Sequence, residues 1–179
     1  MKKPIILAAT LLSAFAFTSC MDDDSNDFED WRRQNDEYLA AIDEKEFTKI
    51  VPEWAPDNSV FIKWHNDRSL NQNSLTPLST STVNIKYELE DIEGTDLGNS
   101  YNAEDSIYQS KVNTNIIGMC AALLSMHVGD SVTMVIPYNS AYGENYNGRI
   151  KPYSNLIYRV KFKEIVAFEK PNDEDLKKP

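Results

Sequence analysis

The chain has 179 residues, of which 41% are hydrophobic and 26% are charged. This composition excludes an intrinsically disordered protein, and the length is too short for a full α/β barrel. Acidic residues outnumber basic ones by 28 to 18, and the resulting net charge of -10 would repel nucleic-acid phosphates. We therefore expect a small globular domain that has no nucleic-acid partner.

Residues 1–19 are typical of a secretory signal. Two lysines precede an apolar run over residues 5–17, which is too short to span a bilayer comfortably. The run ends in the letters FTSC at Cys20, which resemble a bacterial lipobox. The resemblance predicts that Cys20 becomes the lipidated N-terminus of the mature protein. An ordinary secretory signal that is cut nearby is the alternative.

Residues 20–27 form an acidic tether with too little apolar surface to fold. The run that begins at Asp22 resembles the acidic export signal of surface lipoproteins in the Bacteroidetes. This resemblance implies a protein that is lipid-anchored to the bacterial outer membrane and exposed at the cell surface. Retention on the periplasmic face of that membrane is the alternative.

An N-terminal helix is predicted within residues 28–52, because apolar residues recur at helical spacing without an interrupting Gly or Pro. We expect its apolar stripe to pack on the domain that follows. A helix that pairs two chains in a dimer is the alternative, so the oligomeric state stays open. The residues of the stripe are Phe28, Trp31, Tyr38, Leu39 and Ile42.

The domain over residues 58–168 is rich in strand patterns, and residues 169–179 form a charged tail. Alternation of apolar and polar residues predicts half-buried strands. Gly94 and Gly98 predict a turn and a loop rather than a strand. In chain order, the predicted strands cover residues 59–65, at an edge of the sheet, then 82–90, 107–112, 131–136 and 155–168.

Residues 115–126 predict one short, mostly buried helix. Cys120 lies within it and is expected to be a small buried apolar residue rather than a nucleophile. The two histidines, His65 and His127, have no partner at zinc-ligand spacing, so no metal site is expected. Strands around one helix predict an α+β fold in which an antiparallel sheet wraps that helix.

Several motifs in the correct order resemble the family of FKBP-type peptidyl-prolyl cis-trans isomerases. Residues 136–143 (IPYNSAYG) resemble its Ile-Pro…Ala-Tyr-Gly loop, and residues 152–160 resemble its closing strand. Residues 85–87 resemble the strand that opens the family's pocket, and residues 116–129 resemble its central helix and exit turn. The resemblance implies an FKBP-like curved antiparallel sheet around a short helix, and rotamase activity on proline-containing peptides or proteins without a cofactor.

The resemblance also implies the site residues. Tyr87, Ile116, Tyr142 and Tyr158 should form the catalytic pocket, in which the Ile116 N–H donates to a substrate carbonyl and the Tyr142 hydroxyl binds a neighbouring one. Further substrate-binding positions should be Leu97, Met119, Tyr146 and Ile150.

Two departures from the family pattern keep a second function open. Leu97 and Gly98 stand where the family usually has Phe and Asp, and Met119 stands where it often has Trp. The alternative to an isomerase or folding helper is therefore a noncatalytic FKBP-like binding module with a degenerate pocket. A third hypothesis is a structural lipoprotein whose N-terminal helix recruits a partner.

Overall fold

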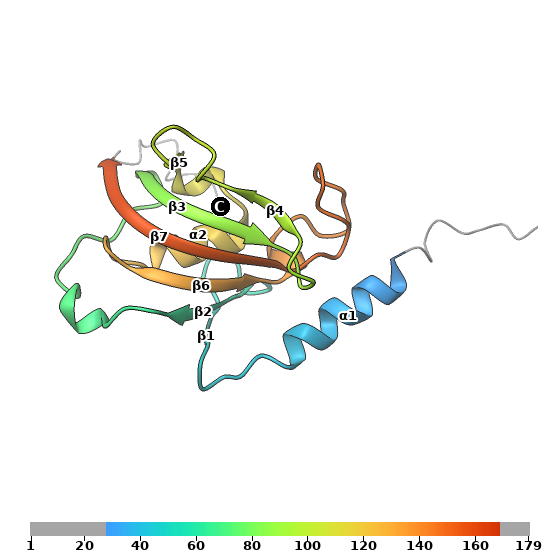
Figure 1. The fold of residues 1–179 in the computed structure, drawn as a ribbon. Coiled ribbons are helices and arrows are strands. Elements are labelled where there is room, and N and C mark those ends of the chain that lie inside the picture. Colours follow the sequence, from blue (N-terminus) through green and yellow to red (C-terminus); the bar gives the residue numbers. More distant parts are fainter. Residues whose placement is uncertain (1–27, 169–179) are drawn as a thin grey trace, which may run out of the picture.

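One antiparallel sheet of seven strands curves around a short helix in the computed structural model, which describes residues 28–168 (Figure 1). The predictions for residues 1–27 and 169–179, including lipidation at Cys20, lie outside the described residues. Within 28–168, no helix is long and apolar enough to cross a membrane. The elements, with 3₁₀ helices labelled η, are α1 (Glu29–Ala40), β1 (Thr48–Ile50), β2 (Val60–Trp64), η2 (Arg68–Leu70), β3 (Thr82–Glu90), β4 (Asp96–Asn99), β5 (Tyr108–Lys111), η3 (Val112–Thr114), α2 (Ile117–Leu124), β6 (Ser131–Ile136), η4 (Tyr138–Ser140) and β7 (Leu156–Ala167).

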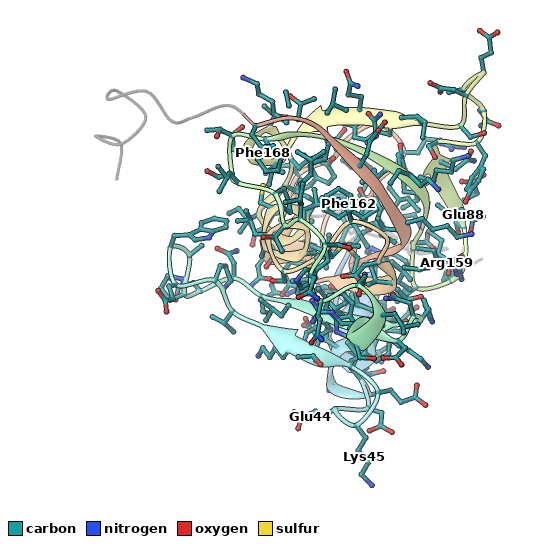
Figure 2. The ribbon with its side chains drawn as sticks, turned by 90° about the vertical axis from the view of Figure 1, so that its left-hand side faces the viewer. Glu44, Lys45, Glu88, Arg159, Phe162 and Phe168 are labelled. Carbon is teal, nitrogen blue, oxygen red and sulfur yellow. The ribbon has the colours of Figure 1, made fainter. Side chains whose placement is uncertain are left out.

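The sheet has the strand order β1-β2-β6-β7-β3-β4, and β5 also pairs with β3. The long strand β7 lies at its centre and alternates between two environments, as the period of two predicts. Figure 2 shows Phe162 pointing into the interior while Arg159 lies beside Glu88 at the surface. Arg159 also forms an ion pair with Glu90 over 2.6 Å. The antiparallel sheet around α2 confirms the predicted α+β fold.

The core lies between the concave face of the sheet and α2. Six of the eight residues of α2 are buried. Gly118 lets the helix approach β6 closely, because a Cβ at this position would clash with Cγ2 of Ile136. A helix of small and apolar residues is therefore held close beneath the sheet. The largest fully buried side chains include Phe162, Ile62, Ile85, Leu123, Met126, Met134 and Ile136.

The N-terminal helix is shorter than predicted, because α1 ends at Ala40 and the chain then turns. The turn is closed by Asp43, whose carbonyl accepts the Glu46 N–H and whose carboxylate accepts the Lys45 N–H. Residues 48–50 then form β1, which pairs with β2. The sheet consequently begins before residue 58, and β2 is an inner strand rather than the predicted edge strand.

The helix α1 packs on its own domain, as predicted. Trp31 is buried, and its Nε1 donates to Ser154 Oγ over 3.0 Å. Asn35 is fully buried against Asn155. These contacts join the helix to the loop that precedes β7.

One predicted loop is a strand. Residues 96–99 form β4, which pairs with the end of β3, and Gly98 lies within it opposite Leu89. The predicted turn at Gly94 is present, with a φ of 80° and with Asp91 Oδ1 accepting the N–H groups of Glu93 and Thr95. The other predicted strands and the central helix are found as β2, β3, β5, β6, β7 and α2.

Candidate functional site

A cavity of about 300 Å³ opens between the concave face of the sheet and the start of α2. None of the residues that line it carries a charged side chain, although the chain as a whole has a net charge of -10. The lining residues are Ile85, Tyr87, Leu89, Tyr108, Thr114, Asn115, Ile116, Met119, Tyr142 and Tyr158.

Four tyrosines from four separate segments meet in this cavity. Tyr87 on β3 packs edge-to-face against Tyr108 on β5, with ring centroids 5.4 Å apart. It also contacts Tyr158 on β7, at 5.8 Å between centroids. Tyr142 comes from the loop after η4. The sheet register explains the arrangement, because it places Tyr108 opposite Ile85 and Tyr158 opposite Leu89.

Three of these tyrosines, Tyr87, Tyr142 and Tyr158, have raised pKa values, so their hydroxyls stay protonated at physiological pH. Burial raises the pKa of Tyr158 well above its usual value, and the nearby phenols of Tyr142 and Tyr87 raise it further. Burial likewise raises the pKa of Tyr87 and of Tyr142, with a contribution from Tyr108 in each case. These side chains therefore offer neutral hydroxyl donors on apolar rings.

The start of α2 forms the other wall of the cavity. Ile116 is the N-cap, and its carbonyl accepts the Cys120 N–H over 3.0 Å. Among the hydrogen bonds found for residues 28–168, none uses the Ile116 N–H. The first N–H groups of a helix have no partner within the helix, so this donor is available to a ligand carbonyl. Met119 is 3% exposed and forms the buried floor.

The loop that carries Tyr142 is held by backbone hydrogen bonds. The Gly143 N–H donates to the Tyr138 carbonyl over 2.8 Å, and the Tyr153 N–H donates to the Gly143 carbonyl over 2.8 Å. Gly143 has a φ of 64°, a conformation that favours glycine. The letters YG in the predicted motif thus form a fixed turn that presents the Tyr142 ring.

Five of the eight predicted pocket residues line this one cavity: Tyr87, Ile116, Met119, Tyr142 and Tyr158. Their roles in catalysis or binding stay predictions. The other three, Leu97, Tyr146 and Ile150, do not line this cavity, and their binding roles likewise stay predictions.

Those three residues contact other parts of the domain. Tyr146 is 64% exposed, and its ring packs edge-to-face against Phe28 at 5.5 Å between centroids. Ile150 is buried in the hydrophobic core, and Leu97 packs against that core from β4. The loop over residues 144–150 therefore turns toward α1 rather than over the cavity.

Tyr108 also lines the cavity but was not predicted as a pocket residue. It lies in the strand predicted at residues 107–112, but its partner Ile85 is defined only by the pairing of β5 with β3. Nothing in the local sequence distinguishes it from Tyr101, which does not line the cavity although the two side chains are similarly exposed, at 41% and 44%. Within residues 28–168, no group of three or more His, Cys, Asp or Glu side chains is placed to hold a metal ion.

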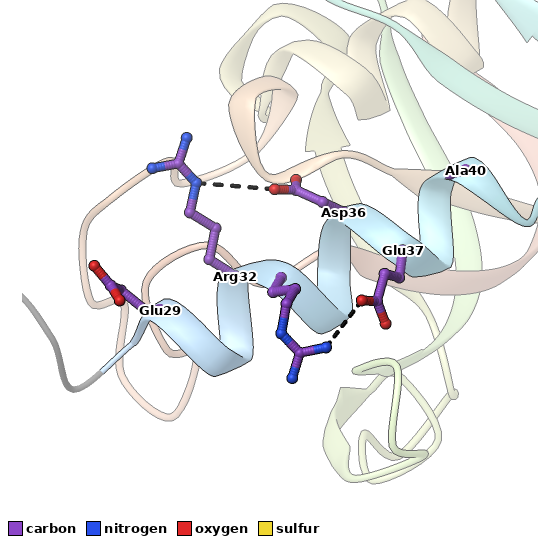
Figure 3. A pocket seen from close by; sticks show the side chains of 6 residues that line it. Glu29, Arg32, Asp36, Glu37 and Ala40 are labelled. Carbon is purple, nitrogen blue, oxygen red and sulfur yellow. Dashed lines mark hydrogen bonds and ion pairs between the residues drawn. The ribbon is translucent and has the colours of Figure 1, made fainter.

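A larger hollow of about 470 Å³ lies along α1 (Figure 3). All of its lining residues belong to this single helix, and both of its arginines form ion pairs with carboxylates of the same helix. Arg33 pairs with Glu37 over 2.9 Å, and Arg32 pairs with Asp36 over 3.9 Å. Because no second element encloses it, this hollow is a weaker candidate site than the tyrosine-lined cavity.

Comparison with known proteins supports the same fold and the family to which the motifs point. The family model described as FKBP-type peptidyl-prolyl cis-trans isomerase matches residues 74–163. The FKBP-type 22 kDa peptidyl-prolyl cis-trans isomerase of Escherichia coli (strain K12) is 35% identical over 91 residues, which is 50% of this chain and 44% of that protein. The match thus spans less than half the length of that curated relative.

Two solved structures have a similar fold. A peptidyl-prolyl cis-trans isomerase from Pseudomonas syringae pv. tomato superposes with a TM-score of 0.60 at 17% identity, over 76% of this chain and 91% of that chain. FkpA from Escherichia coli superposes with a TM-score of 0.60 at 21% identity, over 79% of this chain and 61% of that chain. At these identities the likeness establishes the fold alone.

Proposed function

Because the chain belongs to the family of FKBP-type peptidyl-prolyl cis-trans isomerases, we propose that it catalyses the isomerisation of X-Pro bonds in exposed segments of extracytoplasmic proteins. The observation that carries this proposal is the uncharged cavity that four tyrosines and Ile116 line together. The prolyl ring of a client occupies this cavity.

The chemistry requires only that the twisted amide be favoured over the planar one. Rotation about the X-Pro bond must overcome a barrier of about 18–20 kcal/mol, which comes from amide resonance. Twisting removes that resonance and makes the amide less polar. A water-excluding cavity with the apolar walls of Ile85, Ile116 and Met119 therefore binds the twisted form better than water solvates it.

Hydrogen-bond donors fix the client while its amide rotates. The Ile116 N–H donates to a client carbonyl, and the Tyr142 hydroxyl donates to a neighbouring one. No nucleophile takes part. Cys120 is consistent with this mechanism, because its thiol donates to the Val112 carbonyl over 2.9 Å and burial raises its pKa.

A rate measurement tests the proposal. Full-length protein is added to a short peptide with a single Leu-Pro bond, and cis-trans exchange is followed by NMR. We expect the exchange rate to rise in proportion to protein concentration, and to fall when Tyr158 is replaced by Ala. Binding of the peptide without any rise in its exchange rate would instead identify a noncatalytic binding module. Leu97, Gly98 and Met119 are the residues that favour this alternative.

We also propose that Cys20 carries the lipid that anchors the protein to the bacterial outer membrane, with the acidic tether of residues 20–27 directing the domain to the cell surface. The lipobox-like letters at residues 17–20 and the acidic run from Asp22 support this proposal. On this proposal the clients are proteins outside the cytoplasm. Display on the periplasmic face is the alternative location.

A further inference from the structure

A second cavity, of about 550 Å³, lies next to the tyrosine-lined cavity. Its apolar walls come from three separate segments: Trp54 before β2, Leu78 before β3, and Ile117 and Leu124 on α2. None of its lining residues carries a charged side chain. It is larger than the tyrosine-lined cavity, and the mechanism proposed above does not use it.

Large apolar side chains are exposed around this second cavity. Trp54 is 57% exposed, Leu78 is 47% exposed and Ile117 is 37% exposed. A contiguous apolar patch with a hollow at its centre is typical of a binding surface, whereas isolated exposed apolar residues are not. Folding of residues 28–168 leaves these three side chains available for a ligand.

The two cavities adjoin at the start of α2, where they share one lining residue. Asn115 lines both of them, while Ile116 faces the tyrosine-lined cavity and Ile117 faces the second one. A client bound to the Ile116 N–H therefore lies beside the lining residues of both cavities. Asn115 itself is fixed, because its side-chain amide donates to the carbonyls of Lys111 and Val112 over 2.7 and 3.1 Å.

We propose that the second cavity is a subsite for the same client chain, and that it takes a large aliphatic or aromatic side chain a few residues from the proline. This inference rests on the proposed isomerase function and extends it to client choice. An extended chain advances about 3.3–3.6 Å per residue, so a side chain two to five residues from the proline reaches the neighbouring cavity. The protein then selects proline segments next to exposed apolar residues, which are characteristic of unfolded chains.

The composition of the protein's own tail disfavours it as the occupant. The described chain ends at Phe168, after Ala167, which pairs with Thr82 at the start of β3. Residues 169–179 contain one large apolar side chain, Leu176, among mostly charged residues and prolines. Such a segment cannot fill a cavity of about 550 Å³ with apolar atoms.

The test compares peptides that differ only in one side chain outside the X-Pro pair. Ten-residue peptides carry one Leu-Pro bond and either Leu or Ala at two to five residues on either side of it. Affinity is measured by isothermal titration calorimetry with the full-length protein, and the exchange rate of the same peptides is measured by NMR. At the preferred spacing, we expect Leu to tighten binding about fivefold or more over Ala.

Variants assign that preference to the cavity. Trp54→Ala and Leu78→Ser should each reduce the Leu-to-Ala affinity ratio to within about twofold of unity. Leu70→Ala is the matched control, because Leu70 is 85% exposed and does not line either cavity. This control should keep the full preference.

Three outcomes would overturn the inference: equal affinities for Leu and Ala peptides at every spacing, a preference that survives both cavity variants, or a cavity that is already occupied. Occupancy by the tail would shift the Trp54 indole resonance when residues 169–179 are deleted, and occupancy by a second copy would shift it with protein concentration. Failure of the proposed isomerase function would give a different result. The protein would then accelerate exchange in neither the Leu nor the Ala peptides, while the ratio of their affinities could still be measured.

Discussion

Asn35 of α1 clamps Asn155 in the loop before β7 through two hydrogen bonds. The Asn155 N–H donates to Asn35 Oδ1 over 2.7 Å, and Asn155 Nδ2 donates to the Asn35 carbonyl over 2.7 Å. Both residues are fully buried. Asn155 Oδ1 in turn accepts the Tyr138 N–H over 3.0 Å, at the start of the turn that leads to Tyr142. The N-terminal helix is thereby connected to the wall of the tyrosine-lined cavity.

Replacing Asn35 with Ala should destabilise the domain and disturb the cavity. The substitution leaves the buried Asn155 N–H without its partner, which costs about 1–3 kcal/mol in unfolding free energy. The measurement is urea unfolding at neutral pH, together with the NMR resonances of Tyr142. Asp36→Ala on the same helix is the control, because its pair with Arg32 is half exposed and should contribute less than about 1 kcal/mol. Equal losses in the two variants would contradict the clamp.

Replacing Tyr142 with Phe should weaken client binding without weakening the fold. The change removes one hydroxyl and keeps the ring, so peptide affinity should fall by about 0.5–1.5 kcal/mol with little change in Tm. Titration and thermal unfolding measure the two effects. Tyr146→Phe is the matched control, because Tyr146 is 64% exposed and lies outside the cavity.

If Tyr142→Phe lowers Tm but leaves affinity and exchange rate unchanged, Tyr142 is a packing residue. Met119→Ala should lower stability, in contrast to Tyr142→Phe, since it removes a side chain that is 3% exposed. That variant should lose about 2–5 kcal/mol of stability. Ile116 is less suitable for this comparison, because it is only partly buried.

The stability of the domain should fall in acid because of Asp130, whose side chain is fully buried. Burial acts to raise the pKa of this carboxyl, but hydrogen bonds from Asn71, the His127 N–H and Asn66, together with the charge of Arg68, outweigh it and lower the pKa below 3.8. A group with a lowered folded-state pKa stabilises the fold above its unfolded-state pKa. That contribution is lost as the pH falls through the lower, folded-state value.

Asp130→Asn should therefore cost about 1–3 kcal/mol at neutral pH and progressively less below about pH 4. Urea unfolding of both proteins across this pH range measures the difference. Asp67→Asn is a control at an exposed carboxylate, which caps η2 by accepting the Ser69 N–H over 2.9 Å. A difference between wild type and Asp130→Asn that does not change with pH would rule out this role for the carboxylate.

Replacing Cys20 with Ala should abolish lipid attachment and release the protein into the soluble fraction. Cys20 is the only cysteine at the signal boundary, since the other one, Cys120, is buried within α2. Labelling of cells with radioactive palmitate measures attachment. Continued labelling of the variant would refute the anchor. Replacing Asp22, Asp23 and Asp24 with Ala should keep the label and reduce access of external protease, unless the acidic run is only a spacer.

The sequence by itself determined the long elements and most of the pocket wall. Strands at residues 82–90, 131–136 and 155–168 could be predicted because their alternation continues over six or more residues and one face is buried. Tyr142 could be predicted as a pocket residue because residues 136–143 resemble the FKBP loop, and the turn that presents it has glycine at a positive φ. The short central helix could likewise be predicted from its run of small and apolar residues.

Only the tertiary structure decided the short strands and the rest of the pocket. The three residues of β1 and the four of β4 have no pattern of their own, and they are strands because β2 and β3 offer them hydrogen-bonding partners. Tyr108 reaches the cavity through its register with Ile85, and Tyr146 leaves it to pack on Phe28 of the N-terminal segment. The physical reason is the same for each: the stabilising contact is made with residues far away in sequence, so no local window contains it.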